Sequence, residues 1–148
     1  MGGLSAAACL LQDGHDVKVF EQAPKLGEIG AGIQLSANAM HVLNHINIGE
    51  AVSAISVRPG AYVFRLFDTA EIIQEFSLAD EHLTLHKAPY NQAHRADLYD
   101  LLAEAVLQLK PGAVTLNKRA TGFENRRALL QLRLGPSFRT PGNHWYNN

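Results

Sequence analysis

A chain of 148 residues, of which 47% are hydrophobic and 18% charged, has the length and composition of one globular domain. Its net charge of −1 provides no basic field for nucleic acid or an anionic membrane, and its apolar runs are far shorter than the roughly 20 residues of a membrane span. The single cysteine, Cys9, excludes an intrachain disulfide framework and indicates a reducing compartment, so we expect a cytoplasmic protein.

The first segment predicts a helix followed by a short strand. Residues 4–13 (LSAAACLLQD) are rich in helix formers, and Gly14 follows at the place where a left-handed residue commonly ends a helix. Cys9 is expected to be a small buried residue of this helix. Residues 16–20 (DVKVF) have the composition of a strand.

The next segment predicts irregular backbone and then a second helix. Residues 21–36 contain Pro24 and three glycines, which favours a loop. Ser36 or Asn38 can cap a helix that continues to about Gly49, because apolar residues recur along it at helical spacing.

The middle of the chain predicts a hairpin, a long helix and a further strand. Residues 60–78 contain two strand-like runs around a polar break near Thr69, which indicates an antiparallel hairpin. Residues 94–109 predict the clearest helix, which ends at Pro111. Residues 113–124 alternate as a strand. The residues expected to form the buried stripe of the long helix are Leu98, Leu101, Leu102, Ala105, Val106 and Leu109.

The composition changes after Asn125. Residues 126–148 contain four arginines, no lysine and no acidic residue. We therefore expect a domain over residues 1–125 and a poorly ordered tail over residues 126–148. Out-of-frame or alternatively spliced translation is a hypothesis for the origin of this tail.

The spacing between Gly3 and Glu21 fits part of a dinucleotide-binding unit. That unit consists of a strand, G-x-G-x-x-G, a helix, and a second strand that ends in an acid about 20 residues on. Here Glu21 closes the strand 18 positions after Gly3. In this register the first strand and the first two glycines would precede residue 1. The alternative is an unrelated helix and strand that happen to end in Glu.

Three separated blocks together resemble a known family. GGLSAAACLLQDGHDVKVFEQA, LGEIGAGIQLSANAMHVL and HRADLYDLLAEA resemble the N-terminal part of FAD-dependent aromatic-ring monooxygenases, in particular the salicylate hydroxylase and 3-hydroxybenzoate 6-hydroxylase group. The resemblance implies an α/β fold: an incomplete Rossmann-like FAD-binding domain, its first strand missing, interrupted at about 60–78 by the start of an antiparallel β substrate domain. It also implies that NAD(P)H reduces FAD and that O2 supplies the oxygen for hydroxylating a small phenolic or aromatic acid.

The resemblance assigns cofactor-binding roles to residues in all three blocks. Gly3, with Gly2 beside it, matches the third fingerprint glycine, and Glu21 with Gln22 matches the acid at the adenosine ribose. The segment that matches the flavin side is Gly30, Ala31, Gly32, Ile33 and Gln34. Arg95 matches an arginine at the phosphate–ribose region and Ala120 a strand residue near the adenine. Arg95 also lies in the first turn of its helix, where the helix dipole disfavours a cation, which points to a functional role.

The histidines do not indicate a metal site. His41 and His45 are four residues apart on one predicted helix, but no third ligand follows at suitable spacing, so a solvated helix face is expected. His82 and His86 fall in a predicted loop-to-strand stretch, where a spacing of four does not bring side chains together.

The catalytic residues stay unassigned, because the residues that position substrate in this family lie largely outside the matched blocks. Two alternatives to an active monooxygenase remain at this point. One is a truncated, non-catalytic product with weak or no FAD binding. The other is a different FAD- or NAD-dependent oxidoreductase that shares only the first unit.

Overall fold

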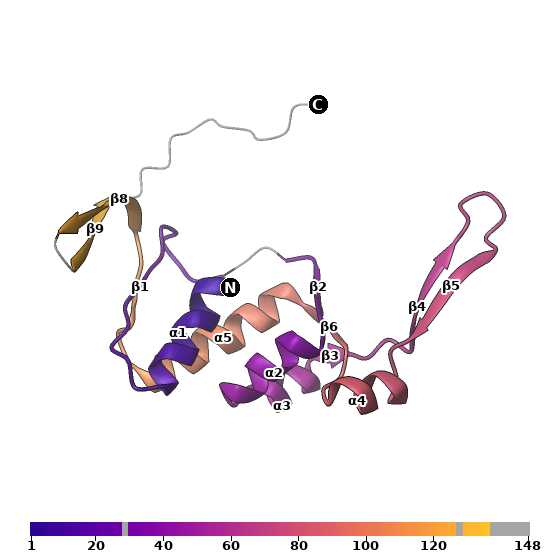
Figure 1. Ribbon diagram of the computed structural model, residues 1–148. Helices are drawn as coiled ribbons and strands as arrows, with labels where there is room; N and C mark the ends of the chain where they lie inside the picture. Colours follow the sequence, from indigo (N-terminus) through magenta and orange to yellow (C-terminus); the bar gives the residue numbers. More distant parts are fainter. Residues whose placement is uncertain (28–29, 127–128, 137–148) are drawn as a thin grey trace.

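The computed structural model describes residues 1–27, 30–126 and 129–136, which form a mixed α/β structure (Figure 1). Helices and strands follow one another in the order α1 (Gly2–Gln12), β1 (Val19–Phe20), β2 (Gly32–Leu35), α2 (Ala37–His45), α3 (Gly49–Ala54), β3 (Ser56–Val57), β4 (Ala61–Arg65), β5 (Ile72–Ser77), α4 (Asp80–His86), β6 (Asn91–His94), α5 (Arg95–Leu109), β7 (Val114–Thr115), β8 (Lys118–Arg126) and β9 (Leu129–Pro136).

Helix α1 ends where the sequence predicted. Gly14 has a φ of 84°, the left-handed conformation that glycine adopts without steric cost, and its N–H donates to the Leu11 carbonyl. Strand β1 is shorter than expected and comprises only two residues. It pairs in parallel with β7, so that Val19 lies opposite Val114. Within the described ranges β7 is the only strand that pairs with β1.

The strand expected over residues 113–124 is divided in two. Asn117 has a φ of 57°, and asparagine is among the few residues that tolerate this left-handed conformation. The turn at Asn117 separates β7, which pairs with β1, from β8, which pairs with β9. Strand β8 pairs with β9, so strand pairing in the described residues crosses the boundary expected at residue 125, while the poorly ordered tail stays a prediction. Residues 127–128 and 137–148 lie outside the described residues.

A second sheet corrects the loop that was expected over residues 21–36. Four residues of this expected loop, Gly32–Leu35, form β2, which pairs antiparallel with β6, and β3 pairs with the same strand. Ile33 and Leu35 alternate with more exposed neighbours, so this short stretch does have strand periodicity. The helix expected up to about Gly49 ends at His45, and α3 begins at Gly49.

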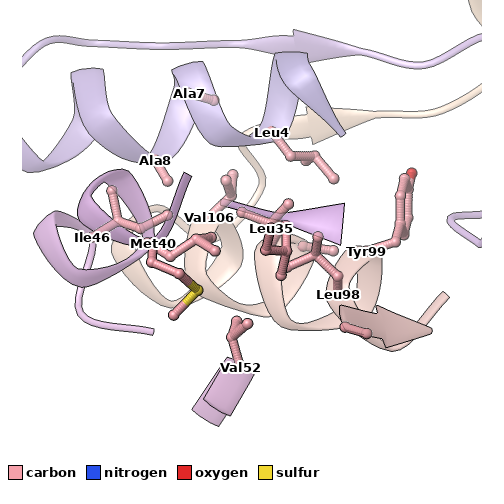
Figure 2. Packing of buried hydrophobic residues seen from close by; sticks show 14 of the residues in the cluster. Leu4, Ala7, Ala8, Leu35, Met40, Ile46, Val52, Leu98, Tyr99 and Val106 are labelled. Atoms are coloured by element: carbon pink, nitrogen blue, oxygen red, sulfur yellow. The ribbon is translucent and has the colours of Figure 1, made fainter. Parts of the chain in front are cut away.

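The core lies between α1, α2, α3 and α5 (Figure 2). Ala8, Met40, Val52, Leu102 and Val106 are each at most 1% exposed. The stripe predicted for α5 is correct except at its end, where Leu109 is 46% exposed; Tyr99, on the same helix, is buried instead. No helix in the described ranges is both long and apolar enough to cross a membrane.

The hairpin expected over residues 60–78 is formed by β4 and β5, which project away from the helices in Figure 1. The stretch after it is helix α4, so the expectation for His82 and His86 was wrong: their ring centroids lie 4.4 Å apart. Asp80 and Glu81 occupy the first turn of α4 and His86 the last, an arrangement that the helix dipole favours.

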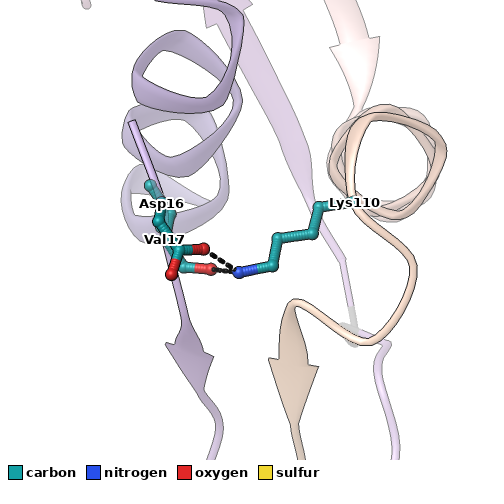
Figure 3. Close-up of polar contacts among 3 residues, drawn as sticks. All are labelled: Asp16, Val17 and Lys110. Carbon is teal, nitrogen blue, oxygen red and sulfur yellow. Dashed lines mark hydrogen bonds and ion pairs between the residues drawn. The ribbon is translucent and has the colours of Figure 1, made fainter. Parts of the chain in front are cut away.

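The C-terminal end of α5 is bonded to the segment before β1 through Lys110 (Figure 3). The Lys110 ammonium forms an ion pair with Asp16 and also donates to the Val17 carbonyl at 3.0 Å. The hydrogen bond and the positive charge of Lys110 hold the pKa of the Asp16 carboxyl below its usual value.

Truncation of the most buried leucine of α5 is expected to destabilise the fold. Leu102→Ala removes a side chain that is 1% exposed and leaves a cavity, so the free energy of unfolding should fall by about 2–5 kcal/mol. Leu85→Ala on α4 is the control, because Leu85 is 75% exposed and its truncation should change stability by less than about 0.5 kcal/mol. Urea unfolding, followed by circular dichroism, measures the free energy of unfolding of both variants. Equal decreases in the two variants would show that Leu102 does not belong to the core.

Replacement of Lys110 should restore the ordinary titration of Asp16. In Lys110→Met the pKa of Asp16 is expected to rise, which carboxyl NMR titration measures directly. Because the folded-state pKa is lowered, the pair stabilises the fold above the unfolded-state pKa of about 3.9, and this contribution is lost as the pH falls through the folded-state pKa. An Asp16 pKa that is unaffected by the replacement would exclude this pair as the cause.

Candidate cofactor-binding site

The first group of candidate residues lines a cleft at the carboxyl end of β1. The cleft has a volume of about 330 Å³. Three of its lining residues, Glu21, Gln22 and Ala120, were selected from the sequence. The other three, Phe20, Lys118 and Arg119, were missed by sequence reasoning. Phe20 directly precedes Glu21, and Lys118 and Arg119 directly precede Ala120, and this adjacency was the available signal.

The backbone fixes Glu21 from both sides. Its N–H donates to the Thr115 carbonyl and its own carbonyl accepts from the Lys118 N–H, both at 2.9 Å. These bonds join the end of β1 to both strands around the Asn117 turn. The Glu21 carboxylate accepts a hydrogen bond from the Ala23 N–H at 2.7 Å. Since an ionised carboxylate can accept about four hydrogen bonds, this one orients the group and leaves capacity for a ligand hydroxyl.

The second group forms where β2 meets the start of α5. The register of β2 and β6 places Gly32 opposite His94 and Gln34 opposite Gln92, and the Arg95 N–H donates to the Ala31 carbonyl at 3.0 Å. The start of this segment, at Gly30 and Ala31, therefore lies beside Arg95.

Gly30 permits this close approach. A Cβ at position 30 would lie 3.0 Å from the Ala96 backbone nitrogen and 3.3 Å from the Cβ of Arg95. Because backbone at the start of a helix cannot move aside easily, only glycine lets the segment lie against α5 without displacement. The sequence indicated a glycine requirement here but could not identify the neighbour that imposes it.

The two N-terminal glycines have different surroundings. Gly2 and Gly3 lie in the first turn of α1, and no described atom outside their immediate chain neighbours and helix lies within 4 Å of a Cβ at either position. The close helix–strand packing that a third fingerprint glycine serves is thus not seen in the described part of the chain. In Figure 1 the N-terminus of α1 lies between the end of β1 and the start of β2.

The histidines of α2 and α4 lie near one another and near Asp13. His41 Nε2 lies 2.9 Å from the His86 carbonyl oxygen, and His45 lies 3.7 Å from Asp13. Burial, and to a lesser extent the nearby His86, lowers the pKa of His82. Among the described residues no group of three histidine, cysteine or acidic side chains is arranged to hold a metal ion.

Alanine at position 30 should disturb the contact between the glycine segment and α5. In Gly30→Ala the new Cβ must displace the segment from Ala96, so the free energy of unfolding should fall by about 1–3 kcal/mol. Gly60→Ala is the control, because among the described residues no atom beyond Gly60 and its chain neighbours lies within 4 Å of a Cβ there. Thermal unfolding measures the difference, and a Gly30→Ala variant as stable as its control would show that the segment lies further from α5.

Comparisons with known proteins identify relatives of the chain. No protein-family model matches the chain. The chain is 34% identical to 6-hydroxynicotinate 3-monooxygenase of Pseudomonas fluorescens over 85% of its length, and 38% identical to 3-hydroxybenzoate 6-hydroxylase 1 of Aquipseudomonas alcaligenes over 84%. It covers 32% of each of these relatives.

A solved structure provides the corresponding comparison of the fold. Klebsiella pneumoniae HpxO, solved with FAD and uric acid, matches 90% of the chain with 26% identity and a TM-score of 0.71, over 32% of the HpxO chain. The chain thus spans about a third of the length of the relatives that it matches. Sequence and fold together show that the chain belongs to the family of FAD-dependent aromatic hydroxylases, as a stretch equivalent to their N-terminal part.

Proposed function

We propose that the chain provides the adenosine-binding region and part of the flavin-binding region of an FAD-dependent monooxygenase that uses NAD(P)H and O2 to hydroxylate an aromatic acid. The named activities of the relatives support the substrate class, because they act on hydroxybenzoate and hydroxynicotinate, both aromatic acids with a ring hydroxyl. In this proposal the protein is cytoplasmic, in keeping with its single cysteine.

The observation that carries the proposal is the cleft at the end of β1. Glu21, Gln22 and Ala120 come from segments about 100 residues apart and line one cleft. A carboxylate at the end of the second strand of a dinucleotide-binding unit can accept hydrogen bonds from ribose hydroxyls. The bond from Ala23 to Glu21 orients the carboxylate before any ligand arrives. Lys118 and Arg119 add positive charge beside it, which suits an anionic nucleotide.

The flavin side of the proposed site comprises Gly30 to Gln34 and Arg95. Bare backbone in the glycine segment permits a flat ring to approach closely, and the Arg95 guanidinium can donate to phosphate oxygens. Gly2 and Gly3, at the N-terminus of α1, would face the pyrophosphate with the positive end of the helix dipole. FAD, when bound, supplies electron transfer from NAD(P)H and the reaction with O2; the residues of this chain bind and orient it.

The alternative is a non-catalytic chain that binds FAD weakly or not at all. The surroundings of α1 favour it, because nothing packs closely against Gly3 within the described ranges and β1 has one paired neighbour there. A different FAD- or NAD-dependent oxidoreductase receives less support, since the relatives match the second and third blocks as well as the first.

Titration of the purified chain with FAD tests the proposal. The bound cofactor should show shifted visible absorption and altered flavin fluorescence. Glu21→Gln removes the negative charge that accepts the ribose hydrogen bonds, so the dissociation constant should rise by about tenfold, which corresponds to about 1.4 kcal/mol.

The matched control is Glu71→Gln, which makes the same chemical change in the hairpin and should leave FAD affinity unaltered. No spectral change on adding FAD to the unmodified chain would reject cofactor binding and favour the non-catalytic alternative. Equal affinities of the two variants would show that Glu21 does not contact the ribose.

A further inference from the structure

A hydrogen bond connects the glycine-rich strand to the projecting hairpin. The Gln34 side chain on β2 donates from Nε2 to the Tyr62 hydroxyl on β4 at 2.6 Å. The two residues are 28 positions apart in the chain, and Gln34 belongs to the segment that the proposed function places at the flavin. Gln34 is exposed and Tyr62 half-buried. An exposed pair keeps one geometry only if one partner is held by other contacts, because ordering free side chains costs entropy.

Tyr62 is held in this way by two aromatic rings. The Phe64 ring stacks on it with centroids 5.7 Å apart and an interplanar angle of 20°. The Tyr90 ring meets it edge to face at 6.1 Å, and Tyr90 is itself buried. These are favourable arrangements for aromatic pairs. The Tyr62 ring is therefore a fixed point to which the flexible glutamine is attached.

The edge-to-face contact places the Tyr90 ring beside Tyr62. Burial raises the pKa of Tyr90, and its interaction with Tyr62 raises it further. Tyr90, which is itself buried, therefore helps to hold the Tyr62 ring whose hydroxyl accepts the Gln34 hydrogen bond.

The consequence for Gln34 follows from the chemistry of a carboxamide. Its side chain carries two N–H donors and one carbonyl acceptor in a plane. Using one N–H on Tyr62 fixes that plane and decides on which side the carbonyl lies. The second N–H and the carbonyl oxygen then form a preset donor–acceptor pair on the glycine-rich strand.

We propose that Tyr62 is a positioning residue that holds the Gln34 carboxamide in one orientation and fastens hairpin β4–β5 to strand β2. The ligand that the oriented carboxamide would meet presents a donor and an acceptor side by side. That ligand role rests on the proposed function, whereas the positioning itself does not. Loss of the Tyr62 hydroxyl should leave the ring stack in place, free the carboxamide and loosen the base of the hairpin.

The test uses the full chain labelled with ¹⁵N and the Tyr62→Phe substitution, which removes only the hydroxyl. The side-chain NH₂ signals of Gln34 are identified by their loss in Gln34→Ala. In Tyr62→Phe these signals should move toward the shifts of a free glutamine, and their hydrogen exchange should accelerate about two- to tenfold, the range for losing one hydrogen bond. Deuterium uptake in residues 61–65 should also rise.

Phe64→Leu is the matched control, because it removes the stacked ring but keeps the hydroxyl of Tyr62. The Gln34 signals should change much less in this variant than in Tyr62→Phe, because Tyr90 still contacts the Tyr62 ring. Unchanged Gln34 signals in Tyr62→Phe would overturn the proposal. Equal changes in both variants would overturn it as well, since packing rather than the hydroxyl would then be the cause.

FAD titration of the same samples separates this proposal from the proposed function. Weaker FAD binding in Tyr62→Phe, by a similar two- to tenfold and with Phe64→Leu unaffected, supports a ligand role for the oriented carboxamide. Failure of the unmodified chain to bind FAD rejects the proposed function, while the NH₂ signals still decide on the positioning. Unaltered FAD affinity in Tyr62→Phe, despite altered Gln34 signals, rejects the ligand role.

Discussion

The packing of α5 against α1 is the constraint on which the other parts of the structure depend. Ala7 and Ala8 of α1 are almost fully buried, and their small side chains let the helix lie close to Leu102 and Val106 of α5. Helix α5 follows β6 and precedes β7, so it links the antiparallel sheet to the parallel pair. Its 15 residues correspond to about 22 Å at 1.5 Å per residue. That length separates Arg95, at the glycine-rich strand, from Lys110, which fastens the segment leading to β1.

The elements that the sequence predicted well are those determined by local interactions. Helix α1 with its Gly14 terminus and helix α5 both follow from helix formers, apolar spacing and a stop signal within a few residues. The incorrect predictions concern elements whose structure depends on contacts with distant parts of the chain. Four residues of the supposed loop form β2 because β6, nearly 60 residues away in the chain, offers a partner edge. The short, partly polar α4 has too little periodicity to distinguish it from a strand.

The sequence selected candidate residues for the site but could not indicate their arrangement. Spacing alone selected Glu21, and the resemblance to a known family supplied Gln22, Arg95 and Ala120. Neither could indicate that the Asn117 turn brings Ala120 to Glu21. A single left-handed residue changes the alternation of apolar and polar residues too little to be recognised in the sequence. Phe20, Lys118 and Arg119 were missed because their types are ordinary on a strand. The contact between Gln34 and Tyr62 depends on where the hairpin lies, which local patterns do not encode.

The projecting hairpin also determines how this chain would associate with others at high concentration. Phe67 is fully exposed, and Ile73, Phe64 and Phe76 are each about half or more exposed on the two strands. Apolar strands with open edges are templates for intermolecular pairing, whereas β1 is too short to serve as one. Self-association through β4 and β5 would leave the cleft at Glu21 uncovered. Charged substitutions near the tip of the hairpin can alter such association without changing the residues that line the cleft.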